Sequence, residues 1–562
     1  MYPRGCSIAE QPTPRVDQDP CVSGTRTLIV NAVVHSRSDP FASALLIDDG
    51  VIAWVGDDAG ARVHHEIADS IVDLDGAFVA PGFVDSHVHA TATGLQLGGV
   101  DMAGARSAKD LLQAVEAAAK AARGGMVYGH GWDETTWTDP RLPTRAEIDR
   151  ASWGSEVYLS RIDVHSALVS SALVARAPGA RSMSGFDAHG VVSRAAHAAL
   201  REEALVRVRP ADRRDAQRRT LRDAAAHGVV CLHEMSGPSI GGADDLRALL
   251  DAASDGAGPL VFGYWGQTAA AGGIEVARDI GAIGVGGDLF VDGSLGSHTA
   301  ALTDPYADRP SESGTLYLSS AEIAEHLRAT TVAGIPGGFH AIGDRACAAV
   351  AAGVAAVAEE LGQGAVRAMG HRIEHAEMLR TEDIATLVDH GVTFSMQPIF
   401  DALWGGSAGM YEQRLASERA TTMNQLASIV SAGGRLAINS DSPVTPMRPW
   451  SIVRAATEHH QATERLSARA AFNAHTRGGW RAAGMEGVGV IDVGAPAHLA
   501  IWDAPALEVR VPQDTVRNWS TDPRAATPEL PDLSEADPPC LATLVHGSVI
   551  HGREYFEAAH AR

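Results

Sequence analysis

The chain has 562 residues, too many for one simple hydrophobic core, and this length predicts one large domain with smaller satellites. Apolar residues make up 45% and charged residues 20%, as in an ordinary globular protein. Acidic side chains outnumber basic ones by 69 to 46, so the surface disfavours nucleic acid or an anionic membrane as the main partner. No apolar run reaches about 18 residues, and we expect no membrane span.

The N-terminus and the cysteines bear on the compartment. Residues 1–24 contain no apolar segment and are expected to form a flexible leader rather than a signal peptide. The five cysteines are scattered, with neither metal-binding spacing nor a disulfide pattern. This usage predicts a reducing compartment, so we expect a cytoplasmic protein. The sequence leaves open whether the chain forms a homo-oligomer.

Both ends of the chain carry β-strand patterns. On the N-terminal side strands are expected at 27–30, 44–47, 51–55, 71–74 and 77–79. Asp48-Asp49-Gly50 predicts a hairpin turn between the second and third of these. On the C-terminal side strands are expected at 490–494, 499–502, 542–545 and 549–550. We therefore expect residues 25–80 and 485–562 to form one small composite β-sandwich.

Residues 81–484 have a different pattern. Short apolar runs alternate with alanine-rich helical segments, such as 108–123, 212–227 and 320–333. This alternation predicts a parallel α/β barrel or a doubly wound sheet. The stretch near 125–219 is longer than one strand–helix unit requires, so we expect a helix-rich inserted subdomain there.

The stretch Val79 to His89 ends a predicted buried strand with two histidines. His87 and His89 are two positions apart, so on an extended backbone both side chains point to the same side. Two imidazoles on one face can hold one metal ion together. The alternative is that they are polar residues at a strand exit. The preceding Pro-Gly-Phe-Val-Asp-Ser run favours the metal site.

Three later residues, His340, His375 and Asp441, also follow short apolar runs. Each lies where a loop of a barrel would begin, and barrel active sites form at the C-terminal ends of the strands. Alone, each would be interpreted as a hydrogen-bonding, turn or capping residue. Together, and in this order, they predict a site for a divalent ion, with Zn²⁺ favoured. Such an ion can lower the pKa of water to about 7, and Asp441 is the candidate that accepts the proton.

Further motifs follow the first one along the chain. They are Gly129-His130-Gly131-Trp132-Asp133, Arg161-Ile162-Asp163-Val164-His165, His233-Glu234-Met235, Asp292-Gly293-Ser294-Leu295-Gly296-Ser297 and Met396-Gln397-Pro398. With the histidine motif, these segments resemble the amidohydrolase superfamily of metal-dependent hydrolases. Within it they are most similar to the amidohydrolase-3 group, which includes N-substituted formamide deformylase-like proteins. The motif ending at His165 has Val164 where the family usually has glycine.

The resemblance implies an α/β fold, a (β/α)₈ TIM-type barrel with a composite β-sandwich built from both chain ends. It also implies that the metal-site residues are His87, His89, His340, His375 and Asp441. One position departs from the family. Binuclear members place a lysine four residues before the D-G-S segment, and its carbamylated amine bridges two metals; here that residue is Asp288.

Because an aspartate cannot be carbamylated and reaches less far, one ion is favoured over two. It would be bound by His87, His89 and Asp441 with His340, or by His340 and His375 with Asp441. Asp288 could still be a short bridge between two ions, or a hydrogen-bonded carboxylate at a strand end.

Trp132, His165 and Trp404 are candidates for substrate contact, although aromatic residues in such positions are as often packing residues. His498, His459 and His460 are interpreted as solvated, His475 as a packing residue, and Arg372 and Glu374 as supports of the site.

Three functions fit these residues. The first is a hydrolase that cleaves a C–N bond of a small amide, N-acyl or N-formyl compound. Metal-activated water would attack, Asp441 would move the proton, and His375 or His165 would polarise the carbonyl oxygen. The second is a deaminase acting on a cyclic amidine. The third is a binding homologue with impaired catalysis, suggested by Asp288.

Overall fold

The computed structural model describes residues 25–508, 529–534 and 536–560. The expected leader at 1–24 lies outside the described residues. Within them, no helix is both long enough and apolar enough to cross a membrane.

The N-terminal strands form a four-stranded sheet with the order β4-β3-β1-β5. Its strands are β1 (Arg26–Val30), β3 (Ala44–Asp48), β4 (Val51–Gly56) and β5 (Ser70–Asp73). As predicted, β3 and β4 form a hairpin. Asp49 and Gly50 both adopt left-handed backbone, with φ of 49° and 75°, as a two-residue hairpin turn with the twist of the strands requires.

A second small sheet is mixed and joins the two ends of the chain. Its order is β2-β6-β19-β22-β23, with β2 (Val33–Val34), β6 (Phe78–Pro81), β19 (Leu499–Trp502), β22 (Cys540–Val545) and β23 (Ser548–His551). Strand β6 pairs antiparallel with β19, although 418 positions separate Pro81 from Leu499. One buried apolar cluster contains residues of both small sheets, including Ile29, Leu45, Val79 and Leu499. Helix α20 (Arg553–His560) packs beside β5.

The strand expected at 490–494 is wrong. This segment is a turn that touches the hairpin through Ile52: Gly494 N–H donates to the Ile52 carbonyl, and Ile52 N–H donates to the Ala495 carbonyl. Gly494 has a φ of 91°, which is incompatible with continuing a strand.

The central region consists of parallel strands. One sheet has the order β14-β13-β7, with β7 (Phe83–Val88), β13 (Val229–Ser236) and β14 (Leu260–Trp265). Another has the order β15-β16-β17-β18, with β15 (Gly338–Ala341), β16 (Arg372–His375), β17 (Thr393–Met396) and β18 (Arg435–Ile438). Single bridges connect the two: Tyr264 to Gly284, Val285 to Gly337 and Phe290 to His340 on one side, and Val88 to Ser442 on the other. The central strands therefore follow one another around a ring.

Helices surround these strands. They are α2 (Ala90–Gly98), α7 (Pro210–Ala226), α8 (Ala243–Ser254), α9 (Gly273–Ile280), α10 (Ser320–Ala333), α11 (Asp344–Leu361), α12 (Gln363–Met369), α13 (Thr381–Asp389), α14 (Pro398–Trp404), α15 (Met410–Ala420), α16 (Leu426–Ser431), α17 (Pro449–Thr457), α18 (Ala468–His475) and α19 (Arg477–Ala482). Because both faces of the strands are covered, strands such as β7 and β16 are buried along their whole length. Because neighbouring strands are parallel, their C-terminal ends point to one end of the ring.

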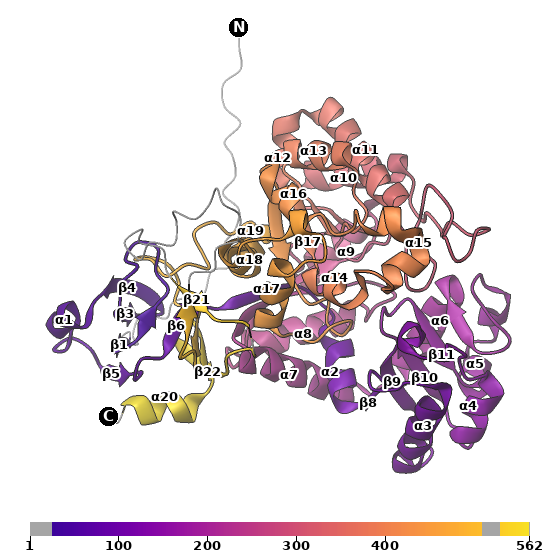
Figure 1. Cartoon of the computed structure of the whole chain (residues 1–562), viewed down its shortest axis with the longest axis horizontal. Helices are drawn as coiled ribbons and strands as arrows, with labels where there is room; N and C mark the ends of the chain where they lie inside the picture. The colour runs from indigo at the N-terminus through magenta and orange to yellow at the C-terminus, as the bar shows by residue number, and fades with distance from the viewer. Residues whose placement is uncertain (1–24, 509–528, 535, 561–562) are drawn as a thin grey trace, which may run out of the picture.

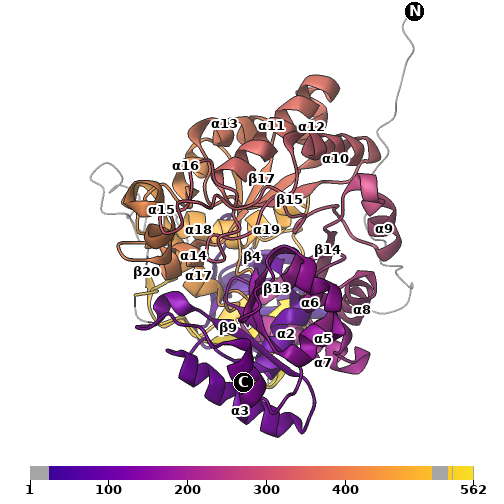
Figure 2. The same ribbon diagram turned by 90° about the vertical axis from the view of Figure 1, so that its right-hand side faces the viewer.

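Between β7 and β13 the chain builds a separate unit with its own sheet, in the order β12-β11-β10-β9-β8. Its strands are β8 (Val100–Asp101), β9 (Val127–Trp132), β10 (Val157–Arg161), β11 (Ser166–Val169) and β12 (Val191–Ser193), and its helices are α3 (Ala108–Ala122), α4 (Arg145–Ala151), α5 (Ser171–Arg176) and α6 (Arg194–Val206). The expected helix-rich stretch thus also contains most of a five-stranded sheet. Figure 1 shows this unit at the lower right, away from the small sheets, and Figure 2 looks onto it.

Candidate metal centre

The predicted ligands meet at the C-terminal ends of the central strands. His87 lies near the end of β7, His89 directly follows it, His340 lies in β15 and His375 ends β16. Asp441 comes three residues after β18. His375 and Asp441 have left-handed backbone, with φ of 69° and 52°. Such backbone is uncommon for residues other than glycine, and it clusters at functional sites.

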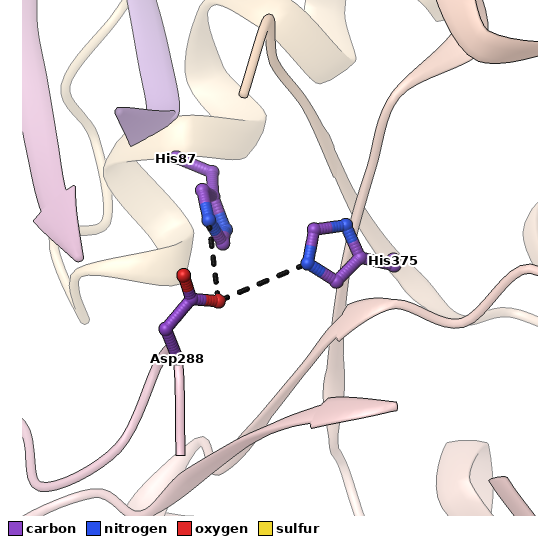
Figure 3. A group of neighbouring side chains, drawn as sticks. All are labelled: His87, Asp288 and His375. Atoms are coloured by element: carbon purple, nitrogen blue, oxygen red, sulfur yellow. Dashed lines mark ion pairs between the residues drawn. The ribbon is translucent and has the colours of Figure 1, made fainter. Parts of the chain in front are cut away.

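Asp288 occupies the middle of this group. Its Oδ1 lies 3.5 Å from His87 Nε2, 3.4 Å from His340 Nδ1 and 3.8 Å from His375 Nε2, and its Oδ2 lies 3.1 Å from His89 Nε2. Figure 3 shows the imidazoles of His87 and His375 turned toward the same carboxylate oxygen. The carboxylate of Asp288 therefore faces the imidazoles of all four histidines of the centre. A carboxylate that only formed a hydrogen bond at a strand end would not need this position.

Asp441 closes the group on the other side. Its Oδ1 lies 3.4 Å from Nε2 of both His87 and His89, and its Oδ2 lies 3.9 Å from His375 Nδ1. Two sets of ligand atoms lie within 4.8 Å of one another: His87, His89 and Asp441, and His87, Asp288 and His375. All of these side chains are buried.

The atoms that face the centre have no hydrogen-bond partner. These buried atoms are His87 Nε2, His340 Nδ1, His375 Nε2, Asp288 Oδ1 and Asp441 Oδ1. A buried polar atom without a partner costs about 1–3 kcal/mol, so native proteins contain few of them. Imidazole and carboxylate atoms that converge in this way fit a divalent ion such as Zn²⁺.

The opposite ring nitrogen of each histidine is engaged. His87 Nδ1 pairs with Glu374 Oε2 at 2.9 Å, and His89 Nδ1 with the Met235 carbonyl at 2.9 Å. His375 Nδ1 pairs with Gln397 Oε1 at 3.0 Å, and His340 Nε2 lies 3.4 Å from the Gly293 carbonyl. Since all four partners are acceptors, a neutral ring carries its proton on the outer nitrogen and presents a lone pair to the centre, as a metal ligand must.

Arg372 and Glu374 support the His87 ring. They alternate with their neighbours along β16, as predicted, and so point to the same side of the strand. Arg372 Nε donates to Glu374 Oε1 at 2.7 Å, and Arg372 Nη2 donates to the Ser86 carbonyl at 2.8 Å. Burial raises the pKa of Glu374, but the Arg372 guanidinium and His87 outweigh it and bring the pKa to about 2. Glu374 is therefore a permanent carboxylate that fixes the His87 ring.

The charges in the centre favour a bound cation. Burial lowers the pKa of His87, but the carboxylates of Asp288 and Asp441 outweigh it and raise the pKa well above its usual range. The pKa of His89 is likewise raised to about 9, against the effect of burial, by Asp288 and Asp441. Protons on these imidazoles thus balance the two carboxylates in the metal-free protein.

Metal affinity should therefore depend on pH. An ion binds only the neutral imidazole, so below a pH of about 9 it must displace the proton of His89. Below this value, each proton that the ion displaces should lower the apparent affinity for Zn²⁺ about tenfold per pH unit. Zn²⁺ titrations against a competing chelator between pH 6 and pH 9 measure the slope. A pH-independent affinity would contradict the arrangement.

The sequence profile of the Amidohydrolase family matches residues 70–551, and the chain belongs to this family. This confirms the resemblance seen in the motifs.

Several individual proteins are similar to this chain. The chain is 27% identical to Protein LONG AFTER FAR-RED 3 of Arabidopsis thaliana over 459 residues, which is 77% of each chain. It is 27% identical over 150 residues to the N-substituted formamide deformylase of Arthrobacter pascens, 26% of this chain and 28% of that protein. The structure is similar to that of an uncharacterized metal-dependent hydrolase from Pyrococcus furiosus, with a TM-score of 0.66 and 27% identity, covering 85% of this chain and 98% of the other. The chain is thus a metal-dependent hydrolase of the amidohydrolase family.

Two pockets open onto the centre. The first lies between the central strands and the inserted unit, and its walls include His89, Tyr128, Tyr158, Arg201 and Phe290. The second is lined by Glu377, Phe400, Trp404, Tyr411 and other side chains. His165, His340, His375 and Asp441 line both pockets. A substrate could therefore reach the same ligand atoms from either side.

Two of the three residues predicted to contact substrate line the pockets, and the third does not. The His165 ring lies 5.1 Å from the His340 ring between centroids, and Trp404 lines the second pocket. Trp132 lines neither pocket: it is buried in an apolar cluster of the inserted unit, and its indole N–H donates to the Leu159 carbonyl at 2.9 Å. Its interpretation as a substrate contact is therefore corrected to packing.

Two further interpretations are wrong. His498 is buried, because its ring stacks on Trp480 with 5.0 Å between centroids. His459 is also buried, and its Nε2 lies 3.6 Å from Asp401. His475 is a packing residue, as predicted, with Nδ1 3.0 Å from the Val84 carbonyl.

Sequence reasoning missed residues that approach the centre from other segments. Glu377 lines the second pocket and accepts a hydrogen bond from the Tyr411 hydroxyl at 2.8 Å, and burial raises its pKa to about 7. Asp163 accepts hydrogen bonds from Ser294 and Ser297, both at 2.7 Å, and so holds the inserted unit against the D-G-S loop. Glu377 follows His375 by two positions, which is a signal that could have been used.

Proposed function

We propose that this chain hydrolyses the C–N bond of a small amide, N-acyl or N-formyl compound. The observation that carries the proposal is the set of buried, unpartnered ligand atoms at the junction of two pockets. Membership in the amidohydrolase family supports the C–N bond as the target.

The residues of the centre have separate roles in this proposal. His87, His89 and Asp441 would hold the ion, with His340, His375 and Asp288 around it. A bound Zn²⁺ would supply a water of lowered pKa and polarise the carbonyl group. Asp441, which lines both pockets, takes the proton of the attacking water and passes it to the leaving nitrogen.

His165 would orient the carbonyl oxygen. Burial lowers the pKa of His165 to about 3, so its imidazole is neutral at physiological pH and can donate one N–H to that oxygen. His375 is the other candidate for this contact, although Gln397 already engages its Nδ1.

One ion for each chain is our proposal for the stoichiometry. His87 Nε2 is a member of both candidate ligand sets, and a single imidazole nitrogen binds only one ion. Asp288 would then stabilise the charge of that ion rather than bridge two.

The ring of central strands over residues 81–484 would be a closed (β/α)₈ barrel with an insertion near 125–219. The shared apolar cluster would make residues 25–80 and 485–562 one composite β-sandwich. We place the enzyme in the cytoplasm. Analytical sedimentation would measure whether it is a monomer or a homo-oligomer.

The test is a hydrolysis panel with the Zn²⁺-loaded protein. We expect turnover of N-formyl or N-acyl compounds, with the free amine and the carboxylic acid detected in equal amounts by mass spectrometry. Release of ammonia from cyclic amidines without any amide hydrolysis would favour the deaminase. Stoichiometric metal with no turnover of either class would favour the binding homologue and contradict the proposal.

A further inference from the structure

Arg201 on helix α6 is a cation without a counter-charge in the first pocket. It lines the pocket, and its Nε is buried without a hydrogen-bond partner. Among the described residues, no ion pair includes it. Other arginines at this helix are paired: Arg194 with Glu312 at 3.7 Å and Arg207 with Glu203 at 2.6 Å.

The groups around Arg201 are neutral. The Tyr158 hydroxyl forms a hydrogen bond with His197 Nε2 at 2.8 Å, and Tyr128 stacks on Tyr158. Burial raises the pKa of Tyr128 to about 12, and burial lowers the pKa of His197 well below its usual range. Nothing on this wall of the pocket offers a negative charge to the guanidinium.

A partly buried charge of this kind is costly unless it is paired. The guanidinium presents a planar fork of N–H donors that matches a carboxylate. The carboxylates that share the pocket, Asp288 and Asp441, point at the metal centre and belong to it. A ligand that enters the pocket can supply the anionic partner that the protein does not.

We propose that Arg201 binds a carboxylate of the substrate, so that the substrates are N-acyl or N-formyl amino acids or similar amides with one free carboxylate. This rests on the proposed function. The pocket that holds Arg201 also contains His89, His340 and Asp441, so one molecule can place its carboxylate on Arg201 and its amide at the centre. One guanidinium matches a single negative charge better than a phosphate dianion. Apolar side chains of the same pocket, including Leu205, Ile240 and Phe290, would contact the amino-acid side chain.

The test compares N-formyl, N-acetyl and N-benzoyl amino acids with their neutral methylamides. For the Zn²⁺-loaded protein we expect kcat/KM to favour the acids by about 10- to 100-fold, the effect of one hydrogen-bonded charge pair. Arg201→Gln should abolish this preference by weakening only the acids. Arg201→Lys should retain part of it. Arg207→Gln, a more exposed change on the same helix, should leave the preference unchanged.

Binding measured by calorimetry separates the two proposals. If an acid binds with an affinity that falls at least tenfold in Arg201→Gln, but no amide is cleaved, the carboxylate site at Arg201 stands and the proposed hydrolysis fails. If amides are cleaved with no preference for acids, or if the preference survives in Arg201→Gln, the inference is overturned and the hydrolysis stands. If none of the acids binds, the inference is overturned as well.

Discussion

Replacing Asp441 by asparagine is expected to lower kcat by about 10²- to 10⁴-fold on any compound of the panel that the enzyme hydrolyses. Asparagine has nearly the same shape and still offers an oxygen to the ion, but it cannot accept a proton. The loss should therefore appear in kcat more than in KM, with the metal still bound.

Asp401→Asn is the matched control. Asp401 is also buried, but it pairs with His459 and His460 and lines neither pocket. We expect it to retain activity once folded. Full activity in Asp441→Asn, measured with confirmed metal content, would remove the proton-transfer role of Asp441.

Replacing Arg372 by methionine is expected to have the largest effect on stability. Arg372 and Glu374 are both buried, with 2.7 Å between Nε and Oε1. Removing one partner of such a pair leaves an uncompensated buried charge, which costs about 3–5 kcal/mol. The remaining Glu374 carboxylate also loses the cation that lowers its pKa. Glu374 would then no longer fix the orientation of the His87 ring.

The measurement is the melting temperature of the metal-free protein, so that a change in metal binding cannot contribute. Arg309→Met, which removes an exposed pair with Glu312, is the control and should cost less than about 1 kcal/mol. The double variant Arg372→Met/Glu374→Gln should recover part of the loss. A melting temperature unchanged in Arg372→Met would contradict the described pairing.

The positions of the metal-centre histidines and of Asp441 were predictable because each lies in, at the end of, or just after a short buried strand. His87, His340 and Asp441 come after apolar runs, and parallel strands bring their C-terminal ends to one side. The structure places them together although 354 positions separate His87 from Asp441. The importance of Asp288 followed from its place before the D-G-S segment, but its approach to all four histidines of the centre depends on side-chain geometry.

The walls of the pockets could not be predicted in the same way. Arg201 lies in the inserted unit, and its approach to the centre depends on contacts such as Asp163 with Ser294 that no local pattern encodes. The burial of His498 and His459 depends on neighbours that are remote in sequence. The strands of the inserted unit were missed because β9 contains glycine and histidine at positions where strands usually have branched residues.

The most direct test is elemental analysis of the protein after Zn²⁺ supplementation and exhaustive dialysis. The wild type should retain one ion for each chain, and His87→Ala should lose it because His87 belongs to both ligand sets. His65→Ala, which removes an exposed histidine, should retain the ion. A wild-type protein without stoichiometric divalent metal, or a His87→Ala variant that binds the ion as tightly as the wild type, would contradict the metal centre.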